Sequence, residues 1–321
     1  MAKSASETDS SSRDITFRSY TSEQGKAYAE FRRDYSPALY QYVIDHHTST
    51  GGQLDTILDV GCGPGNVARA LAPRFTRAIG IDPSEGMIAI ARSLGGSSSA
   101  GPIRFEISTA EDLGSSLSPP VSDGSVDLVT AATAAHWFDM PAFWARAARI
   151  LKPGGSVALW CRGDPNAHPS TPNVAAIQAA IDRFKDQIED YAREGNRLAS
   201  NLYAGLPLPW TVPGAPQTEF DESAFLRKEW KATDIAYRPE DNPFADGRKL
   251  DLDRVEKALG TMSQVTRWRE AHPETVGTED DIVRKLRREI ERLLREAGVE
   301  EGNEVLEQGG SGVLLMVKKK A

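Results

Sequence analysis

The stretch ILDVGCGPGN, residues 57–66, decides the fold class of this chain. It runs from an apolar segment through Asp59 into three glycines, Gly61, Gly63 and Gly65. Glycine permits a tight turn and lets a ligand lie against bare backbone. In open α/β sheets the ligand crevice lies at the carboxyl ends of the strands. The stretch therefore predicts a strand, a ligand-binding turn and a helix, although a glycine-rich turn alone is also compatible with a purely structural role.

The two common phosphate-binding patterns fit these glycines poorly. The dinucleotide pattern G-x-G-x-x-G places its third glycine one position later, where this chain has Asn66. The phosphate loop G-x-x-x-x-G-K-[ST] requires a lysine that does not follow here. A nicotinamide dehydrogenase is therefore disfavoured, and the turn is expected to hold another kind of ligand.

The residues around this stretch alternate between strand and helix patterns. Short apolar runs predict strands at 56–60, 77–81, 103–107, 126–132 and 156–160, with helices between them. This alternation is typical of a parallel sheet covered by helices on both faces. Two more strands are expected at 304–308 and 313–317. The predicted fold is α/β, with a Rossmann-like, seven-stranded and mostly parallel sheet.

The pattern divides the chain into five parts. Residues 1–14 are polar and are expected to be a disordered leader, and residues 15–55 predict an N-terminal helical cover. Residues 56–160 form the Rossmann-like, ligand-binding core. Residues 161–275 lose the alternation and predict an inserted substrate cap rich in Pro, Trp and Tyr. Residues 276–321 hold an amphipathic helix and two strands that are expected to complete the core.

Composition limits the classes of function. The 321 residues carry a net charge of -8, which argues against nucleic-acid binding, because phosphate contacts need clustered Lys and Arg. No apolar run reaches about 18 residues, so no membrane span is expected. Cys62 and Cys161 are too few for a disulfide framework or a four-ligand zinc site, and no metal is predicted. The polar start predicts a cytoplasmic protein, and the oligomeric state is not indicated.

Three side chains near the glycines are candidates for ligand contact. Asp82 ends the second strand, about twenty residues after the glycines, where a carboxylate can accept hydrogen bonds from both hydroxyls of a ribose. Asp59 can reach a cationic end of the ligand or orient the turn. Met87 offers a polarisable face for a planar ring. Each also has a structural interpretation, Asp82 as a helix cap and Met87 as a core residue.

These residues resemble the class I S-adenosylmethionine-dependent methyltransferases. The D-x-G-x-G-x-G turn, the acidic Asp82, the segment STAEDL at 108–113 and the stretches VDLVTAATAAHWFD at 126–139 and RILKPGGSVALW at 149–160 carry the resemblance. The last two are similar to a subgroup of small-molecule methyltransferases that includes fungal trans-aconitate and cantharidin-type enzymes. In this family the sheet ends in an antiparallel hairpin strand, which the two C-terminal strands would match.

The resemblance implies S-adenosylmethionine as cofactor, with S-adenosylhomocysteine as product, and a small-molecule methyl acceptor as partner. It implies that Gly61, Gly63 and Gly65 lie against the methionine part, Asp82 on the ribose, Met87 on adenine, Ala110 and Glu111 at the adenine edge, and Ala132 and Thr133 near the sulfonium. We expect O-methylation of a carboxylate or hydroxyl. N- or C-methylation, or a cofactor-binding protein without transfer activity, remain alternatives.

His136 follows the fourth strand, near where the methyl group is expected to point. It is a candidate catalytic base for a hydroxyl acceptor, whereas a carboxylate acceptor needs none because it is already anionic. Contact with substrate or cofactor, or a structural role, are the alternatives. The substrate site is predicted to draw on aromatic and cationic side chains of the helical cover and the cap: Tyr20, Tyr28, Trp137, Trp210, Arg267 and Trp268.

Overall fold

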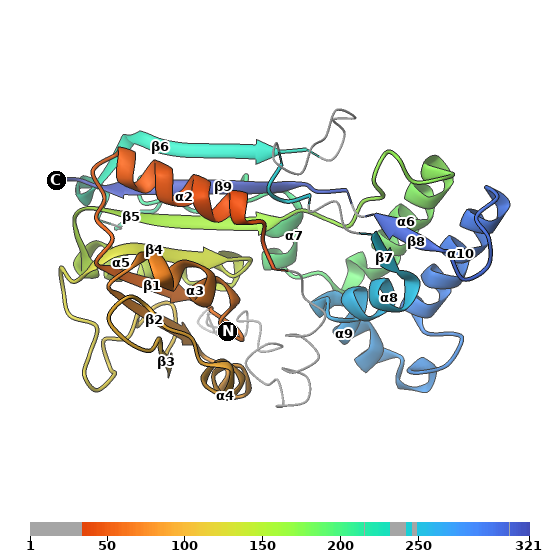
Figure 1. Ribbon diagram of the computed structural model, residues 1–321, viewed down its shortest axis with the longest axis horizontal. Coiled ribbons are helices and arrows are strands. Elements are labelled where there is room, and N and C mark those ends of the chain that lie inside the picture. The colour runs from red at the N-terminus through yellow and green to blue at the C-terminus, as the bar shows by residue number, and fades with distance from the viewer. Residues whose placement is uncertain (1–33, 215, 232–241, 246–248, 308) are drawn as a thin grey trace, which may run out of the picture.

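A seven-stranded sheet forms the centre of the protein. The computed structural model describes residues 34–214, 216–231, 242–245, 249–307 and 309–321. The strand order is β3-β2-β1-β4-β5-β9-β6 (Figure 1). The strands are β1 (Thr56–Val60), β2 (Arg77–Asp82), β3 (Arg104–Ile107), β4 (Val126–Ala132), β5 (Leu151–Arg162), β6 (Phe220–Trp230) and β9 (Gly312–Lys319). Only β9 runs antiparallel to its neighbours, so the predicted mostly parallel, Rossmann-like α/β fold is confirmed.

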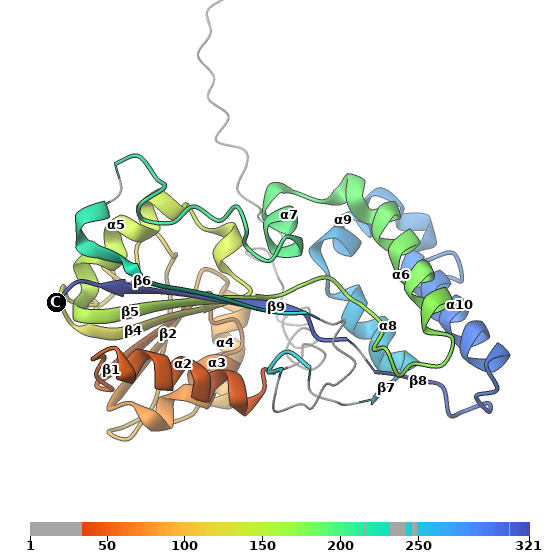
Figure 2. The same ribbon diagram turned by 90° about the horizontal axis from the view of Figure 1, so that it is seen from above.

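Helices cover both faces of this sheet, as Figure 2 shows. On one face lie α2 (Pro37–Ser49), α3 (Asn66–Leu71), the 3-10 turn η1 (Ala72–Arg74) and α4 (Glu85–Leu94); on the other lies α5 (Met140–Ile150). Phe143 and Trp144 of α5 are fully buried against the sheet. Because both faces are covered, β1 is buried along its whole length, which explains its continuous apolar pattern.

A second, mainly helical unit lies beyond the carboxyl ends of the parallel strands (Figure 1). It contains α6 (Val174–Ile188), α8 (Leu252–Gly260), α9 (Ser263–Ala271) and α10 (Ile282–Glu296), with the small sheet of β7 (Lys249–Asp251) and β8 (Val305–Glu307). The short turns η3 (Glu189–Tyr191), η4 (Gln217–Glu219) and η5 (Pro273–Thr275) complete the connections. Between this unit and the core, α7 (Glu194–Ser200) lies against η2 (Ala135–Trp137).

The predicted boundaries of the cap and of the C-terminal part are corrected by these contacts. The strand β6 falls in the predicted cap, 161–275, but it pairs with β9 at the edge of the main sheet. The helix α10 and the strand β8 fall in the part expected to complete the core, yet α10 buries its apolar face against the helical unit and β8 pairs with β7. The two C-terminal strands therefore do not form a hairpin. Local pattern identifies each element but not its partner.

In the described part of the predicted helical cover, 15–55, the structure has the helix α2. Helix α2 begins after Ser36, whose side chain accepts a hydrogen bond from the N–H of Ala38. The predicted leader, 1–14, and the candidates Tyr20 and Tyr28 lie outside the described residues. Among the residues that the structure describes, no helix combines the length and apolarity needed to cross a bilayer.

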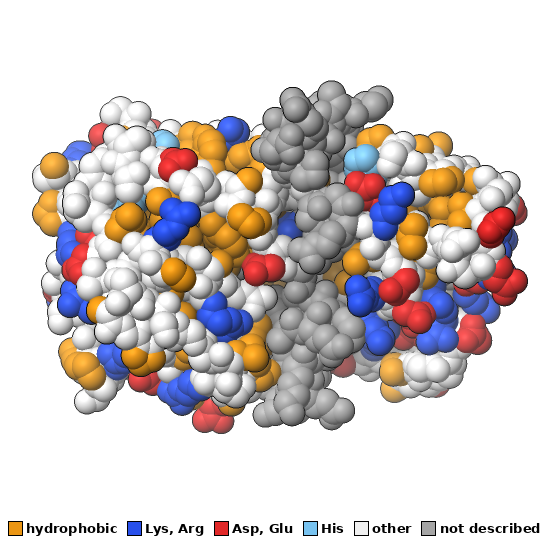
Figure 3. Space-filling view, viewed as in Figure 1, with side chains coloured by type: hydrophobic (Ala, Val, Ile, Leu, Met, Phe, Trp, Pro, Cys, Tyr) orange, Lys and Arg blue, Asp and Glu red, His pale blue; other side chains and the backbone are white. Residues whose placement is uncertain are grey.

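The arginine-rich helix α10 carries mixed charge on its exposed side. Arg284 pairs with Glu256 at 2.8 Å, Arg287 with Asp253 at 2.7 Å, and Arg295 with Glu304 at 2.6 Å. Figure 3 shows blue and red side chains intermixed over this end of the molecule. Such a surface is a solvated face, because its cations are matched by acids rather than gathered into a patch.

Candidate active site

A cavity of about 340 Å³ lies at the carboxyl ends of β1, β2 and β4, facing the helical unit. Its position is the one expected for ligands in open α/β sheets. The structure brings most of the predicted site residues to its wall: Asp59, Gly61, Gly63, Asp82, Met87, Ala110, Glu111, Ala132, Thr133, His136 and Trp137. Residues separated by more than seventy positions in the sequence therefore share one site.

The glycine turn presents backbone to this cavity. Gly63 has a φ of +52°, and a Cβ added there would meet nothing within 4 Å. Its N–H donates to Oδ2 of Asp82 at 2.9 Å. Gly65 does not line the cavity; it caps the start of α3, with the ring of Phe105 behind it. The open space beside Gly63 leaves room for a ligand to approach the main chain.

Asp82 links the turn to the following helix. Besides the N–H of Gly63, its carboxylate accepts the N–H of Ser84 at 2.9 Å through Oδ1. Ser84 itself caps α4. The side chain of Asp82 is 9% exposed and faces the cavity. Asp82 therefore both orients the glycine turn and faces the cavity.

Asp59 is an unusually buried carboxyl group. It is 1% exposed; Oδ1 accepts a hydrogen bond from Thr130 Oγ1 at 2.8 Å, and Oδ2 has no partner among the described residues. Burial raises the pKa of Asp59 to about 7, opposed by hydrogen bonding to Thr130 and to the backbone N–H of Ala68. An unpartnered buried carboxylate oxygen is costly unless a cation or donor pairs with it. The site therefore favours a cationic ligand at this point.

The part of the cavity wall next to α4 is more apolar. Met87, on the first turn of α4, is 3% exposed, and Ala110 is 6% exposed. Both line the cavity beside Glu111, whose Oε1 accepts the N–H of Asp139 at 3.0 Å. A thioether and a small side chain form a flat, polarisable surface that suits a planar ring.

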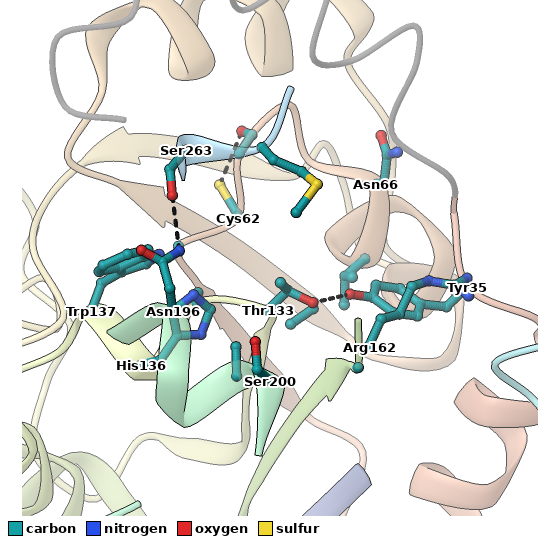
Figure 4. A pocket seen from close by; sticks show the side chains of 18 of the residues that line it. Tyr35, Cys62, Asn66, Thr133, His136, Trp137, Arg162, Asn196, Ser200 and Ser263 are labelled. Atoms are coloured by element: carbon teal, nitrogen blue, oxygen red, sulfur yellow. Dashed lines mark hydrogen bonds between the residues drawn. The ribbon is translucent and has the colours of Figure 1, made fainter. Parts of the chain in front are cut away.

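Thr133 follows β4 at the centre of the cavity, in a left-handed conformation with a φ of +51°. Its Oγ1 lies 2.6 Å from the hydroxyl of Tyr35 (Figure 4). The guanidinium of Arg162, at the end of β5, lies 5.1 Å from the centre of the Tyr35 ring. A non-glycine residue in this conformation costs free energy, so the surrounding contacts hold Thr133 in place.

The imidazole of His136 is hydrogen-bonded to a buried phenol. Its Nδ1 lies 2.9 Å from the hydroxyl of Tyr203, which is 1% exposed. Burial raises the pKa of the Tyr203 phenol well above its usual value, so it keeps its proton and can donate it to Nδ1. A neutral His136 then carries its hydrogen on Nε2.

The wall contributed by the helical unit contains residues that the sequence did not indicate. Asn196 and Ser200 of α7, and Ser263 and Gln264 of α9, also line the cavity. Figure 4 shows the hydrogen bond between Asn196 and Ser263. No local motif marks these positions, because their proximity depends on how α7 and α9 meet. Arg162 could have been suggested by its place after a parallel strand.

Three predicted substrate residues do not line the cavity. Trp210 stacks edge-on against Phe225, with ring centres 5.2 Å apart. Trp268 lies parallel to the ring of His272 at 4.4 Å and packs in the helical unit. Arg267 donates through Nε to the carbonyl of Tyr191 at 2.8 Å. Trp210 thus packs on the main core, and Arg267 and Trp268 make their contacts within the helical part, away from the cavity wall.

The fold and the turn together define a Rossmann-like nucleotide-binding protein, and known sequences specify it further. A family model described as a methyltransferase domain matches residues 58–159. Methyltransferase cfoB of Aspergillus candidus is 34% identical over 227 residues, covering 69% of this chain and 66% of that protein. CRG1 of Saccharomyces cerevisiae, named a probable S-adenosylmethionine-dependent methyltransferase, is 24% identical over 81% of this chain and 86% of its own length.

A solved structure shares the fold. The candidate type II methyltransferase from Anaeromyxobacter dehalogenans superposes with a TM-score of 0.55 at 23% identity, covering 90% of this chain and 97% of that one. The match to the first curated relatives spans 47 to 66% of their length. The chain therefore carries a methyltransferase domain over residues 58–159, and the cofactor of such a domain is S-adenosylmethionine.

Proposed function

We propose that this protein transfers the methyl group of S-adenosylmethionine to a carboxylate oxygen of a small molecule. The observation that carries the proposal is one cavity with two chemically different walls. The wall formed by β1, β2 and β4 has acidic side chains and open backbone, which suits a cationic nucleoside. The wall formed by α7, α9 and the loop after β4 has neutral hydrogen-bonding groups.

The residues of the first wall fit the cofactor. Asp59 has the buried, unpartnered oxygen that a sulfonium or ammonium group would neutralise. Asp82 is proposed to bind the ribose hydroxyls, Met87 to lie on adenine, and Ala110 and Glu111 to contact its edge. Ala132 and Thr133 are proposed to lie near the reacting methyl. When bound, the cofactor supplies an electrophilic methyl group, and the protein supplies position and a dry site.

The second wall favours a carboxylate over a hydroxyl as methyl acceptor. Because Tyr203 occupies Nδ1 of His136, the Nε2 of a neutral His136 is a donor and cannot remove a proton. A donor orients a carboxylate, which is anionic near neutral pH and needs no base. The carboxylate oxygen forms a bond to the methyl carbon, the carbon–sulfur bond breaks, and its electron pair remains on sulfur. The products are a methyl ester and S-adenosylhomocysteine.

The test uses cofactor labelled with tritium in the methyl group. Purified protein is incubated with a panel of small carboxylic acids, the matching alcohols and phenols, and the matching amines. Methyl esters release volatile methanol in dilute base, whereas ethers and methylamines keep the label. Base-labile product from acids alone supports the proposal. Base-stable product would show hydroxyl or nitrogen methylation, and binding without any product would show a protein that holds the cofactor without transferring its methyl group.

A further inference from the structure

Asn196 has an amide whose orientation is fixed by its neighbours. Its Oδ1 accepts the backbone N–H of Arg193 at 3.0 Å and a hydrogen bond from Nη2 of Arg267 at 2.6 Å. Its Nδ2 donates to Oγ of Ser263 at 2.9 Å. Because two donors point at one end of the amide, that end is the oxygen and the other end is the NH2 group.

Arg267 holds this arrangement from behind the cavity wall. Its Nε donates to the carbonyl of Tyr191 at 2.8 Å, and its Nη2 also lies 3.3 Å from Oγ of Ser263. The guanidinium thus joins η3, α7 and α9 around one side chain. With Asn196 only 8% and Ser263 only 3% exposed, an amide turned the other way would set its NH2 hydrogens against two partly buried donors and leave these groups unsatisfied.

The helix that carries this amide packs against the turn that carries His136. Gly195 lets α7 approach η2 closely, since a Cβ at this position would lie 2.6 Å from the carbonyl oxygen of His136. Asn196 lines the cavity on the same wall (Figure 4). An amide nitrogen carries two hydrogens, and the described residues provide an acceptor, Ser263, for one of them.

We propose that the second N–H of Asn196 donates to an oxygen of the substrate, and that Arg267 is a positioning residue acting through Asn196. Together with Nε2 of His136, this donor selects substrates that carry a carboxylate or an adjacent carbonyl over those that present only N–H donors. The inference rests on the proposed function and adds the residue that determines substrate choice.

The variant Asn196→Asp separates this role from a structural one. Its carboxylate still accepts from the N–H of Arg193 and from Arg267, and Oγ–H of Ser263 can donate to the new oxygen, so the cap of α7 is kept. Only the N–H donor is lost. The probe is the carboxylic acid with the lowest KM in the tritium assay. We expect its KM to rise at least about tenfold, with the Kd for S-adenosylmethionine within about twofold and Tm not lowered.

Asn201→Asp is the matched control, because Asn201 is exposed at the end of the same helix and is expected to leave KM unchanged. Arg267→Gln should raise KM in the normal background but not in Asn196→Ala, where nothing is left to position. An unchanged KM in Asn196→Asp, or a full effect of Arg267→Gln on top of Asn196→Ala, would overturn this inference. Absence of any base-labile ester from the unmodified protein would instead overturn the proposed function.

Discussion

The hydroxyl of Tyr203 lies 2.9 Å from Nδ1 of His136, across 67 positions of sequence. Tyr203 follows α7 and is fully enclosed, while His136 lies in η2 at the cavity wall. A buried hydrogen bond of this kind determines which nitrogen of an imidazole carries the proton. It therefore determines whether His136 offers the cavity a donor or a base.

Replacing Tyr203 by Phe should release this constraint. Tyr203→Phe keeps the ring packing but removes the hydroxyl that donates to Nδ1, so His136 can adopt either tautomer. We expect kcat/KM for the methyl acceptor to fall about tenfold, with the Kd for S-adenosylmethionine unchanged by calorimetry. Tyr42→Phe, on α2 and away from the cavity, is the control. Equal kcat/KM for Tyr203→Phe and the unmodified protein would show that the contact is only structural.

Substitutions of His136 distinguish a donor from a base. Glutamine places an N–H near the position of Nε2 but cannot take up a proton near neutral pH. We expect His136→Gln to retain kcat within about tenfold, whereas His136→Ala should lose about a hundredfold in kcat/KM. Steady-state kinetics with the preferred carboxylic acid provide the measurement. Inactivity of both variants to the same degree would restore the catalytic-base hypothesis.

Asp59 should make cofactor binding depend on pH. Its pKa of about 7 in the ligand-free protein means that it is largely protonated below that value. A cation favours the carboxylate, so binding should lower this pKa and release a proton. We expect the Kd for S-adenosylmethionine to rise as pH falls below about 7. Calorimetry in buffers of different ionisation enthalpy measures the released proton directly, and Asp59→Asn should bind weakly with a flat pH profile.

The buried carboxyl group of Asp59 should lower the stability of the ligand-free protein. The folded pKa of Asp59 is raised above its ordinary value, so the folded state binds more protons than the unfolded state between the two pKa values. Stability contributed by the neutral form is present below the unfolded pKa and is lost as pH rises through about 7. Ligand-free Asp59→Asn should therefore melt at a higher temperature than the unmodified protein at about pH 8. A lower Tm would contradict the burial argument.

A pair of glycine variants separates backbone strain from ligand approach. Gly63 and Gly124 have φ values of +52° and +61°, and an added Cβ meets nothing within 4 Å at either position. Alanine at each should cost a similar amount, about 1–2 kcal/mol. Only Gly63 lines the cavity. We expect Gly63→Ala to weaken S-adenosylmethionine binding at least about tenfold and Gly124→Ala to leave it unchanged. Equal calorimetric Kd values for the two variants would show that the glycine turn does not contact S-adenosylmethionine.

The part of the cavity at the strand ends could be predicted because its residues lie at the ends of strands that are neighbours in the sheet. In a parallel sheet the segments after β1, β2 and β4 meet at one edge whatever the details of packing. Asp59, Gly63, Asp82 and Thr133 therefore could be placed together from their positions after apolar runs, and the structure places all of them on one cavity.

The second wall could not be predicted, because it depends on contacts between elements without a repeating rule. The pattern of Ile282–Glu296 indicated an amphipathic helix, but not that it packs on α6 rather than on the sheet. Arg267 was expected at a substrate carboxylate, and the structure shows it bonded to Tyr191 and Asn196. An arginine looks the same in sequence whether its partner is a ligand or a neighbouring helix.

The sequence by itself determined the α/β fold and the position of the glycine turn and of Asp82 at one edge of the sheet, because strand periodicity and the geometry of parallel sheets are local rules that the chain expresses directly. Only the tertiary structure decided that Tyr203 reaches His136 and that Arg267 orients Asn196. The residues of each pair come from segments far apart in the chain. They are in contact because of the way α7 and α9 pack at the strand ends, and this packing does not follow from sequence periodicity.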